Sequence, residues 1–210
     1  MTFPLSAPPT PSAASRPGTR RTRLTPEREN ELFTAVLDLV RDVGYETMTM
    51  EAVALASRCS KATLYRQWRD KPCLVAAALR HMRPFRLDHL DTGSLRGDLY
   101  ELARRMGGAT KDLDLMRGVV LAIRKDADLA EAVHAALVQP EIDVLNAILE
   151  RAVARGETDP GNPAAAFLSH MISGAVFSRP ILEQREADAG YLVRYLDAVI
   201  LPALTRTPTP

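Results

Sequence analysis

The chain has 210 residues, of which 46% are hydrophobic and 25% charged, as expected for a globular protein with a sizeable core. No apolar run approaches the ~18 residues of a membrane span, and the N-terminus lacks the apolar block of a secretory signal. A cytoplasmic location is therefore expected. The two cysteines, Cys59 and Cys73, cannot form a disulfide framework and are expected to act as small buried hydrophobic residues.

The net charge of +1 hides an asymmetry along the chain. From Arg16 to Arg83 there are 13 Lys and Arg against 8 Asp and Glu, whereas from Pro84 onward there are 14 against 18. A basic N-terminal third on an acidic remainder favours a nucleic-acid-binding module joined to a second unit.

Residues 1–19 are rich in Pro, Ser and Ala and cannot build a packed core, so a disordered arm is predicted there, with a similar tail at 205–210. Between these ends the spacing of apolar residues predicts only helices and short loops, and the fold class is all-α. No alternating strand pattern and no internal repeat is found.

The first helix is predicted to begin at a Thr25 cap followed by proline and to end at Gly44. A second runs from a Thr49 cap through Ser57, and a third from a Ser60 cap through Trp68. The fourth opens near residues 70–72 and should break near Pro84.

The second half is predicted to hold helices at about 95–107, 112–125 and 128–155. Pro140 should kink the last of these, and Arg155-Gly156 should end it. Asn162-Pro163 opens a further helix that is predicted to stop before Pro180, and the final helix covers about 188–203.

The segment Thr49–Pro72 reads as a short helix, a tight turn and a second short helix, which is the pattern of a helix-turn-helix. At 100° per residue, Leu64 and Trp68 share the face that should pack inward. The outward arc offers cations, hydroxyls, an amide and a methyl group, which suit the edges of bases and the phosphates of a DNA major groove. Lys71, in the first turn of the next helix, is predicted to bind a phosphate. The alternative is a solvated charged face on an ordinary helical bundle.

The sequence Gly44-Tyr45-x-x-Met48-Thr49-Met50-x-x-Val53-Ala54, followed by Ser60-Lys61-Ala62-Thr63-Leu64-Tyr65-x-x-Trp68-x-x-Lys71-x-x-Leu74-Val75, resembles the DNA-binding domain of the TetR family. The match covers about residues 25–80, and Leu129–Glu157 is similar to the C-terminal domains of actinobacterial-type members. Two positions depart from the family pattern: Arg58 stands where glycine is usual, and Cys59 stands where an aliphatic residue is usual.

The resemblance implies a DNA-binding domain at 20–83 and a helical regulatory and dimerisation domain at 84–204, about nine helices in all. It also implies that an arginine-rich arm can follow the DNA backbone or enter the minor groove, although a solubilising tail is the alternative. The predicted DNA-binding residues are Arg20, Arg21, Arg23, Thr49, Arg58, Ser60, Lys61, Ala62, Thr63, Tyr65, Arg66, Gln67 and Lys71.

A homodimer is expected because a single short recognition helix reads few base pairs, whereas a symmetric dimer reads two half-sites of a pseudo-palindromic operator. Its interface is assigned to the last two helices, where Gly174 permits close approach; the alternative is that these residues only complete the monomer core. The predicted interface residues are Phe167, Gly174, Phe177, Leu192, Tyr195, Leu196 and Val199.

The family resemblance also implies a pocket for a small, mainly apolar effector, since the second half offers few convergent charges. Methionines and histidines in this half serve equally well as ordinary core or surface residues. The candidate lining residues are Phe85, Met106, Met116, Ile123, His134, Leu137, His170 and Met171.

No catalytic, metal-binding or cofactor-binding signature is present in the sequence. The prediction is a homodimeric transcriptional regulator, in the first instance a repressor released from double-stranded DNA by an effector. One alternative is a DNA-binding regulator without a small-molecule ligand. The other is an all-helical enzyme or carrier with an incidental helix-turn-helix.

Overall fold

The computed structural model describes residues 24–83, 90–108 and 112–205, and every regular element in these ranges is helical. Nine continuous helices are present in them when π-helical and 3₁₀ turns are joined to the α-helices that they extend. The predicted arm at 1–19, most of the predicted tail, the arm residues Arg20, Arg21 and Arg23, and Phe85 lie outside the described residues.

The N-terminal helices begin where side-chain caps were predicted. Helix α1 spans Pro26–Val43, and the Thr25 side chain accepts a hydrogen bond from the N–H of Arg28. The chain leaves this helix through Gly44 at φ 82°, a positive value that glycine adopts without strain. Helices α2 and α3 span Met50–Ala56 and Lys61–Gln67, and α4 spans Lys71–His81.

Helix α5 spans Leu95–Gly107 and α6 spans Leu113–Ile123, within one or two residues of the predicted bounds. The long third helix of this half is composite: α7 spans Ala127–Val133, a π-helical turn spans His134–Val138, and α8 spans Gln139–Ala154. Irregularity near Pro140 was predicted, and the π turn lies directly before it.

The last two helices differ in part from the prediction. A 3₁₀ turn, Pro163–Phe167, opens helix α9, which spans Leu168–Glu183 and contains Pro180 in its last turn. The prediction that this helix stops before Pro180 is therefore wrong. Helix α10 spans Ala189–Tyr195, a π-helical turn spans Leu196–Ile200, and α11 spans Leu201–Thr205.

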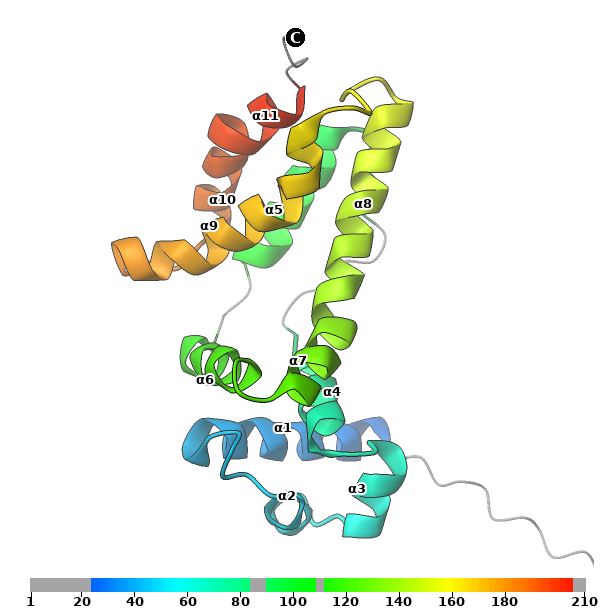
Figure 1. The fold of residues 1–210 in the computed structure, drawn as a ribbon, viewed down its shortest axis with the longest axis vertical. Helices are drawn as coiled ribbons and strands as arrows, with labels where there is room; N and C mark the ends of the chain where they lie inside the picture. Colours follow the sequence, from blue (N-terminus) through cyan, green and yellow to red (C-terminus); the bar gives the residue numbers. More distant parts are fainter. Residues whose placement is uncertain (1–23, 84–89, 109–111, 206–210) are drawn as a thin grey trace, which may run out of the picture.

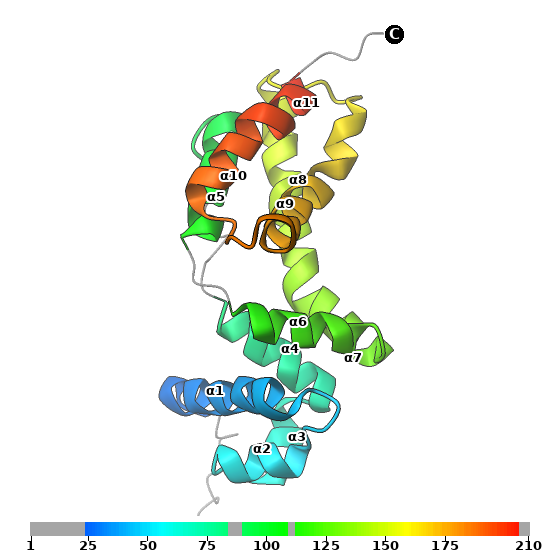
Figure 2. The same ribbon diagram turned by 90° about the vertical axis from the view of Figure 1, so that its left-hand side faces the viewer.

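The described helices form two layers (Figures 1 and 2). Each layer has its own hydrophobic core. The first, called here the lower core, unites α1–α4 with Leu115 and Val119 of α6 and Leu129 of α7. The second, the upper core, unites α5, α8, α9, α10 and α11. Helices α6 and α7 thus pack with the N-terminal helices, although they follow the predicted boundary at residue 83.

Helix α8 runs from the lower layer to the upper layer, with α4 beside its lower end (Figure 1). At that junction Arg83, just beyond α4, donates to the carboxylate of Glu141 in α8 at 2.6 Å. Both side chains are about one-fifth exposed, so the ion pair is shielded from solvent. The junction therefore holds α4 and α8 together between the two cores.

Candidate nucleic-acid interface

Two hydroxyl side chains cap the helices of the α2–α3 unit. Thr49 accepts a hydrogen bond from the N–H of Ala52 at 3.1 Å, and Ser60 accepts one from the N–H of Thr63 at 3.1 Å. Each cap satisfies a backbone donor that a short helix leaves unpaired at its start. The caps explain why such short segments form helices at two defined positions.

The turn between these helices has the hydrogen bonds of a Schellman motif. The N–H of Cys59 bonds the carbonyl of Ala54 at 2.9 Å, and the N–H of Arg58 bonds that of Leu55 at 3.2 Å. Arg58 occupies the left-handed position at φ 52°, the conformation that glycine adopts more readily. Its side chain is exposed at the turn.

A further arginine, which the sequence interpretation did not single out, supports this turn from α1. Arg28 of α1 donates through Nη2 to the carbonyl oxygen of Ser57 at 2.8 Å. The Ser57 hydroxyl is buried and donates to the carbonyl of Val53 at 2.6 Å. These contacts fix the end of α2 on α1, so the turn presents the start of α3 in one orientation.

Helix α3 has the predicted inward and outward faces. Leu64 is fully buried in the lower core, and the ring of Trp68 packs edge-on against Phe33 with centroids 5.5 Å apart. On the other side, Tyr65 is 48% exposed. The exposed members of the predicted set on this helix are Lys61, Ala62, Tyr65 and Arg66, whereas Thr63 and Gln67 are half-buried.

The side chain of Gln67 has a polar atom without a hydrogen-bond partner among the described residues. Its side-chain Nε2 is buried and has no hydrogen-bond partner there. Because buried donors are nearly always paired, this amide is an exception among the described polar groups of α3.

Lys61 is paired with a carboxylate of the preceding helix. Its ammonium forms an ion pair with Glu51 in the first turn of α2. The hydrogen bond from Lys61 lowers the pKa of Glu51, and the same bond raises the pKa of Lys61. Both groups are therefore charged at neutral pH, and the pair links α2 to α3 on their exposed side.

The ammonium of Lys71 forms hydrogen bonds within its own protomer. Its Nζ donates to the carbonyl oxygens of Tyr45 and Met48 at 3.0 and 3.2 Å and lies 4.2 Å from the centre of the Tyr45 ring. The two hydrogen bonds use two of the three ammonium donors. The predicted phosphate contact would therefore rely on the remaining donor.

The predicted effector-binding residues that the structure describes do not come together. Met106 and Met171 belong to or pack on the upper core, whereas Ile123 and Leu137 pack on the lower core. Met116, His134 and His170 are exposed. Around Met106 the apolar residues of α5, α9 and α10 enclose a cavity of only about 10 Å³, room for about one water molecule.

The predicted dimer residues also separate into two groups. Leu192 and Leu196 are 5% and 4% exposed and belong to the upper core, which favours the alternative that these two residues complete the core of the monomer. Tyr195 is half-buried and lines the small cavity. The exposed residues of the set are Phe167, Gly174, Phe177 and Val199.

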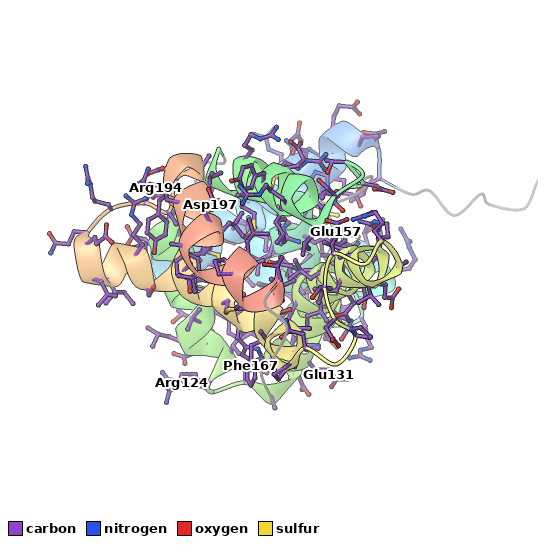
Figure 3. The ribbon with its side chains drawn as sticks, turned by 90° about the horizontal axis from the view of Figure 1, so that it is seen from above. Arg124, Glu131, Glu157, Phe167, Arg194 and Asp197 are labelled. Carbon is purple, nitrogen blue, oxygen red and sulfur yellow. The ribbon has the colours of Figure 1, made fainter. Side chains whose placement is uncertain are left out.

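The exposed residues of α9 form a stripe at helical spacing. Phe167, labelled in Figure 3, is 59% exposed, and Phe177 and Ile181 are 50% and 77% exposed. Helix Pro163–Glu183 is also long and apolar enough to cross a membrane by length and composition alone, and 22% of its most apolar window is buried. The sequence interpretation did not detect this because Ser, His, Gly and Arg interrupt the apolar run.

The α2–turn–α3 unit, with a buried inner face and a cationic, hydroxyl-bearing outer face, defines a helix-turn-helix DNA-binding protein. Residues 32–78 match the family described as "Bacterial regulatory proteins, tetR family", and residues 89–199 match "Tetracyclin repressor-like, C-terminal domain". The chain belongs to the TetR family of DNA-binding transcriptional regulators.

Relatives cover almost the whole chain. Uncharacterized HTH-type transcriptional regulators of Mycobacterium tuberculosis and Mycobacterium bovis are 32% identical over 86% of this chain and 89% of their own length. The DNA-binding transcriptional repressor TetR of Mycobacteroides abscessus is 33% identical over 81% of this chain and 90% of its own.

Solved structures share the fold. The flavonoid-responsive regulator FrrA has a TM-score of 0.63 at 21% identity, covering 87% of this chain and 100% of its own. A crystal structure of another TetR family transcription regulator has a TM-score of 0.57 at 25% identity, covering 86% of this chain and 100% of its own.

Proposed function

We propose that this regulator is a cytoplasmic homodimeric repressor that inserts α3 of each protomer into successive major grooves of a pseudo-palindromic operator. The observation that supports this most directly is the outer face of α3, where Lys61, Tyr65 and Arg66 are exposed opposite the buried Leu64. The similarity to a mycobacterial transcriptional repressor supports the direction of control.

Within this docking, the roles of individual side chains follow from their chemistry. Lys61 and Ala62 are proposed to reach base edges, whereas hydroxyl and amide groups fix the register on phosphates. Arg58 at the turn and the arm arginines add charge beside the duplex. The proposed backbone contacts are Arg20, Arg21, Arg23, Thr49, Arg58, Ser60, Thr63, Tyr65, Arg66, Gln67 and Lys71.

The dimer is proposed to form through the exposed stripe of α9. Its members at spacings of three and four are Phe167, His170, Gly174, Phe177 and Ile181, a heptad-like seam. A Cβ placed on Gly174 would meet no atom within 4 Å of its own protomer, so the surface there is open to a partner helix. Covering this seam with a second copy explains an exposed apolar helix better than a membrane does, because the helix packs on α8 and α10.

The experiment that tests the proposal is selection of genomic DNA fragments by the purified protein, with light scattering to measure the mass of the free protein. Recovery of inverted-repeat fragments by a dimer supports the docking. Recovery of no preferred fragment, or a monomer that binds as tightly as the dimer, contradicts it.

Control by a small molecule is supported by two structural neighbours, one described as flavonoid-responsive and one as a complex with choline. In this chain the upper core itself encloses only about 10 Å³. A groove of about 330 Å³ lies beside it and is lined by residues that include Leu95, Glu157 and Leu201, at the lower end of the ~300–1,000 Å³ of a ligand pocket. The filled core favours the alternative, a regulator without a small-molecule ligand, or else an effector that binds in this groove or after the helices separate. Titration of an apolar compound library by thermal shift, followed by operator affinity, distinguishes the two.

A further inference from the structure

One carboxylate lies on the surface that is proposed to face DNA. Glu51 is the only acidic residue between 50 and 67, a segment that also carries Arg58, Lys61 and Arg66. Its side chain is 62% exposed and pairs with Lys61, which is 49% exposed. A lone carboxylate beside phosphates is repelled by them, so its position on this surface calls for a reason.

The ion pair changes what Lys61 can do. A lysine ammonium is a point charge on a flexible four-carbon stem, and when free it can reach several neighbouring phosphates. While the pair is intact, the Glu51 carboxylate lies beside the ammonium and repels any phosphate that the remaining donors could reach. A contact to guanine O6 or N7 can instead use the remaining ammonium donors while the pair stays intact.

We propose that Glu51 is a specificity-determining residue, which withholds the Lys61 ammonium from phosphates and reserves it for a base edge. The inference rests on the proposed docking of α3. Glu51 then lowers the affinity for DNA of any sequence. It lowers the affinity for the operator less than that for other sequences, and this difference is the specificity.

The test uses Glu51→Gln, which keeps the size of the side chain and removes its charge. Sites are selected from a randomised duplex pool with the wild-type protein and with the variant, and affinity for the wild-type site and for a shuffled duplex is measured against salt. The variant should bind the shuffled duplex several-fold tighter, with a salt slope steeper by about 0.9 from one added phosphate contact. Its selected sites should lose the preference for guanine at one position of each half-site.

The control is Asp114→Asn, which removes an exposed carboxylate paired with Arg117 on α6 and so makes the same change in net charge away from α3. It should change neither slope nor preference. A second experiment compares Lys61→Met with the double variant Glu51→Gln/Lys61→Met. Without Lys61, removing the carboxylate should no longer change the salt slope or the selected sites. Thermal unfolding of each variant establishes that the folds are equal.

The proposal is overturned if the slope and the selected sites of Glu51→Gln equal those of the wild type, or if its effect persists without Lys61. A preference that moves to a different base, instead of relaxing, shows that Glu51 reads a base itself and also overturns it. If the wild-type protein selects no site at all, the docking of α3 has failed, which is a separate result.

Discussion

At the scale of single residues, the helix-turn-helix turn holds Arg58 in the left-handed region, where among the described non-glycine residues only Gln184 also lies. The same Schellman hydrogen bonds end α8, where the N–H of Glu157 bonds the carbonyl of Ala152 and Gly156 takes the left-handed position at φ 73°. One chain thus makes the same cap with glycine in one place and with Arg58 in the other. Glycine at position 58 would relieve the left-handed strain and make the protein more stable. Because strained residues cluster at functional sites, we expect Arg58 to contribute to DNA binding.

Replacing Arg58 separates strain from charge. Arg58→Gly should raise the free energy of unfolding by about 1 kcal/mol because it relieves the left-handed strain, whereas Arg58→Ala should not. Both should make the salt slope of operator binding shallower by about 0.9 if one phosphate contact is lost. Urea denaturation and binding at several salt concentrations measure these effects; an unchanged slope in both variants would remove Arg58 from the interface.

Lys71 illustrates how a cation can serve the fold before it serves a ligand. Lys71→Met keeps most of the stem and removes both hydrogen bonds to the Tyr45 and Met48 carbonyls, so we expect a loss of about 1–3 kcal/mol in the free energy of unfolding. Chemical denaturation measures this loss. A variant as stable as the wild type would show that the two contacts contribute little, and its salt slope would then report the phosphate contact alone.

At the scale of elements, proline and the π turns occur together. The turns at residues 134–138 and 196–200 each end two residues before a proline, Pro140 and Pro202 respectively. Proline has no N–H to donate and clashes with the carbonyl four residues earlier, and a wider turn accommodates both effects. In contrast, Pro180 lies within α9 without a π turn among the described residues. Sequence alone predicted irregularity at Pro140 but not its form.

A hydrogen bond joins the loop between α1 and α2 to the start of α7. The Tyr45 hydroxyl donates to Asp126, the cap of α7, at 2.8 Å. Hydrogen bonds from the N–H of Leu129 and then from Tyr45 lower the pKa of Asp126. The stability that comes from this depressed pKa is complete above the unfolded value of about 3.9 and is lost as pH falls through the folded value.

Tyr45→Phe should therefore destabilise the protein by about 1 kcal/mol near pH 7. Its deficit relative to the wild type should shrink as acid protonates Asp126. Urea melts between neutral pH and pH 3 measure this difference. The control is Tyr100→Phe, which removes an exposed hydroxyl bonded to Asp197 of the upper layer (Figure 3) and should cost less. A deficit for Tyr45→Phe that is independent of pH would contradict the role of the charged acceptor.

At the scale of the whole molecule, the two cores form two bodies, and α9 on the upper core presents the exposed seam. The lower core carries α3 together with α6 and α7, so these helices are expected to move as one body during any change in the spacing of the recognition helices. The upper core carries α9 and with it the proposed dimer contact. Helix α8 and the Arg83–Glu141 ion pair connect the two.

Charge placed in the seam tests the dimer. Phe177→Glu should give folded monomers whose operator binding is weakened at least tenfold, since a 1.4 kcal/mol loss of pairing already has that effect. Light scattering and circular dichroism measure the mass and the helix content.

Leu121→Glu provides the matched control, because Leu121 is 62% exposed on α6 and outside the seam, and it should leave the dimer intact. Leu196→Glu should instead unfold the upper core, because that side chain is 4% exposed. A dimeric Phe177→Glu would place the interface elsewhere.

Local patterns predicted much of the fold and the inner face of α3. The caps at Thr25, Thr49 and Ser60 were predicted from residue type, and they lie at those positions because capping depends on a few neighbouring residues. The bond between Glu51 and Lys61 was not predicted, since it depends on the angle between two helices and no spacing rule within one helix reports that angle.

What the sequence by itself determined is therefore the helical class, most helix starts, the helix-turn-helix and four of the exposed residues of α3, all of which follow from local spacing and side-chain chemistry. Only the tertiary structure decided that Leu192 and Leu196 are core residues while Phe177 and Ile181 are open, and that Ile123 and Met106 belong to different cores. The physical reason is that apolar side chains are equivalent in sequence, and their burial is set by which helices the chain brings against them.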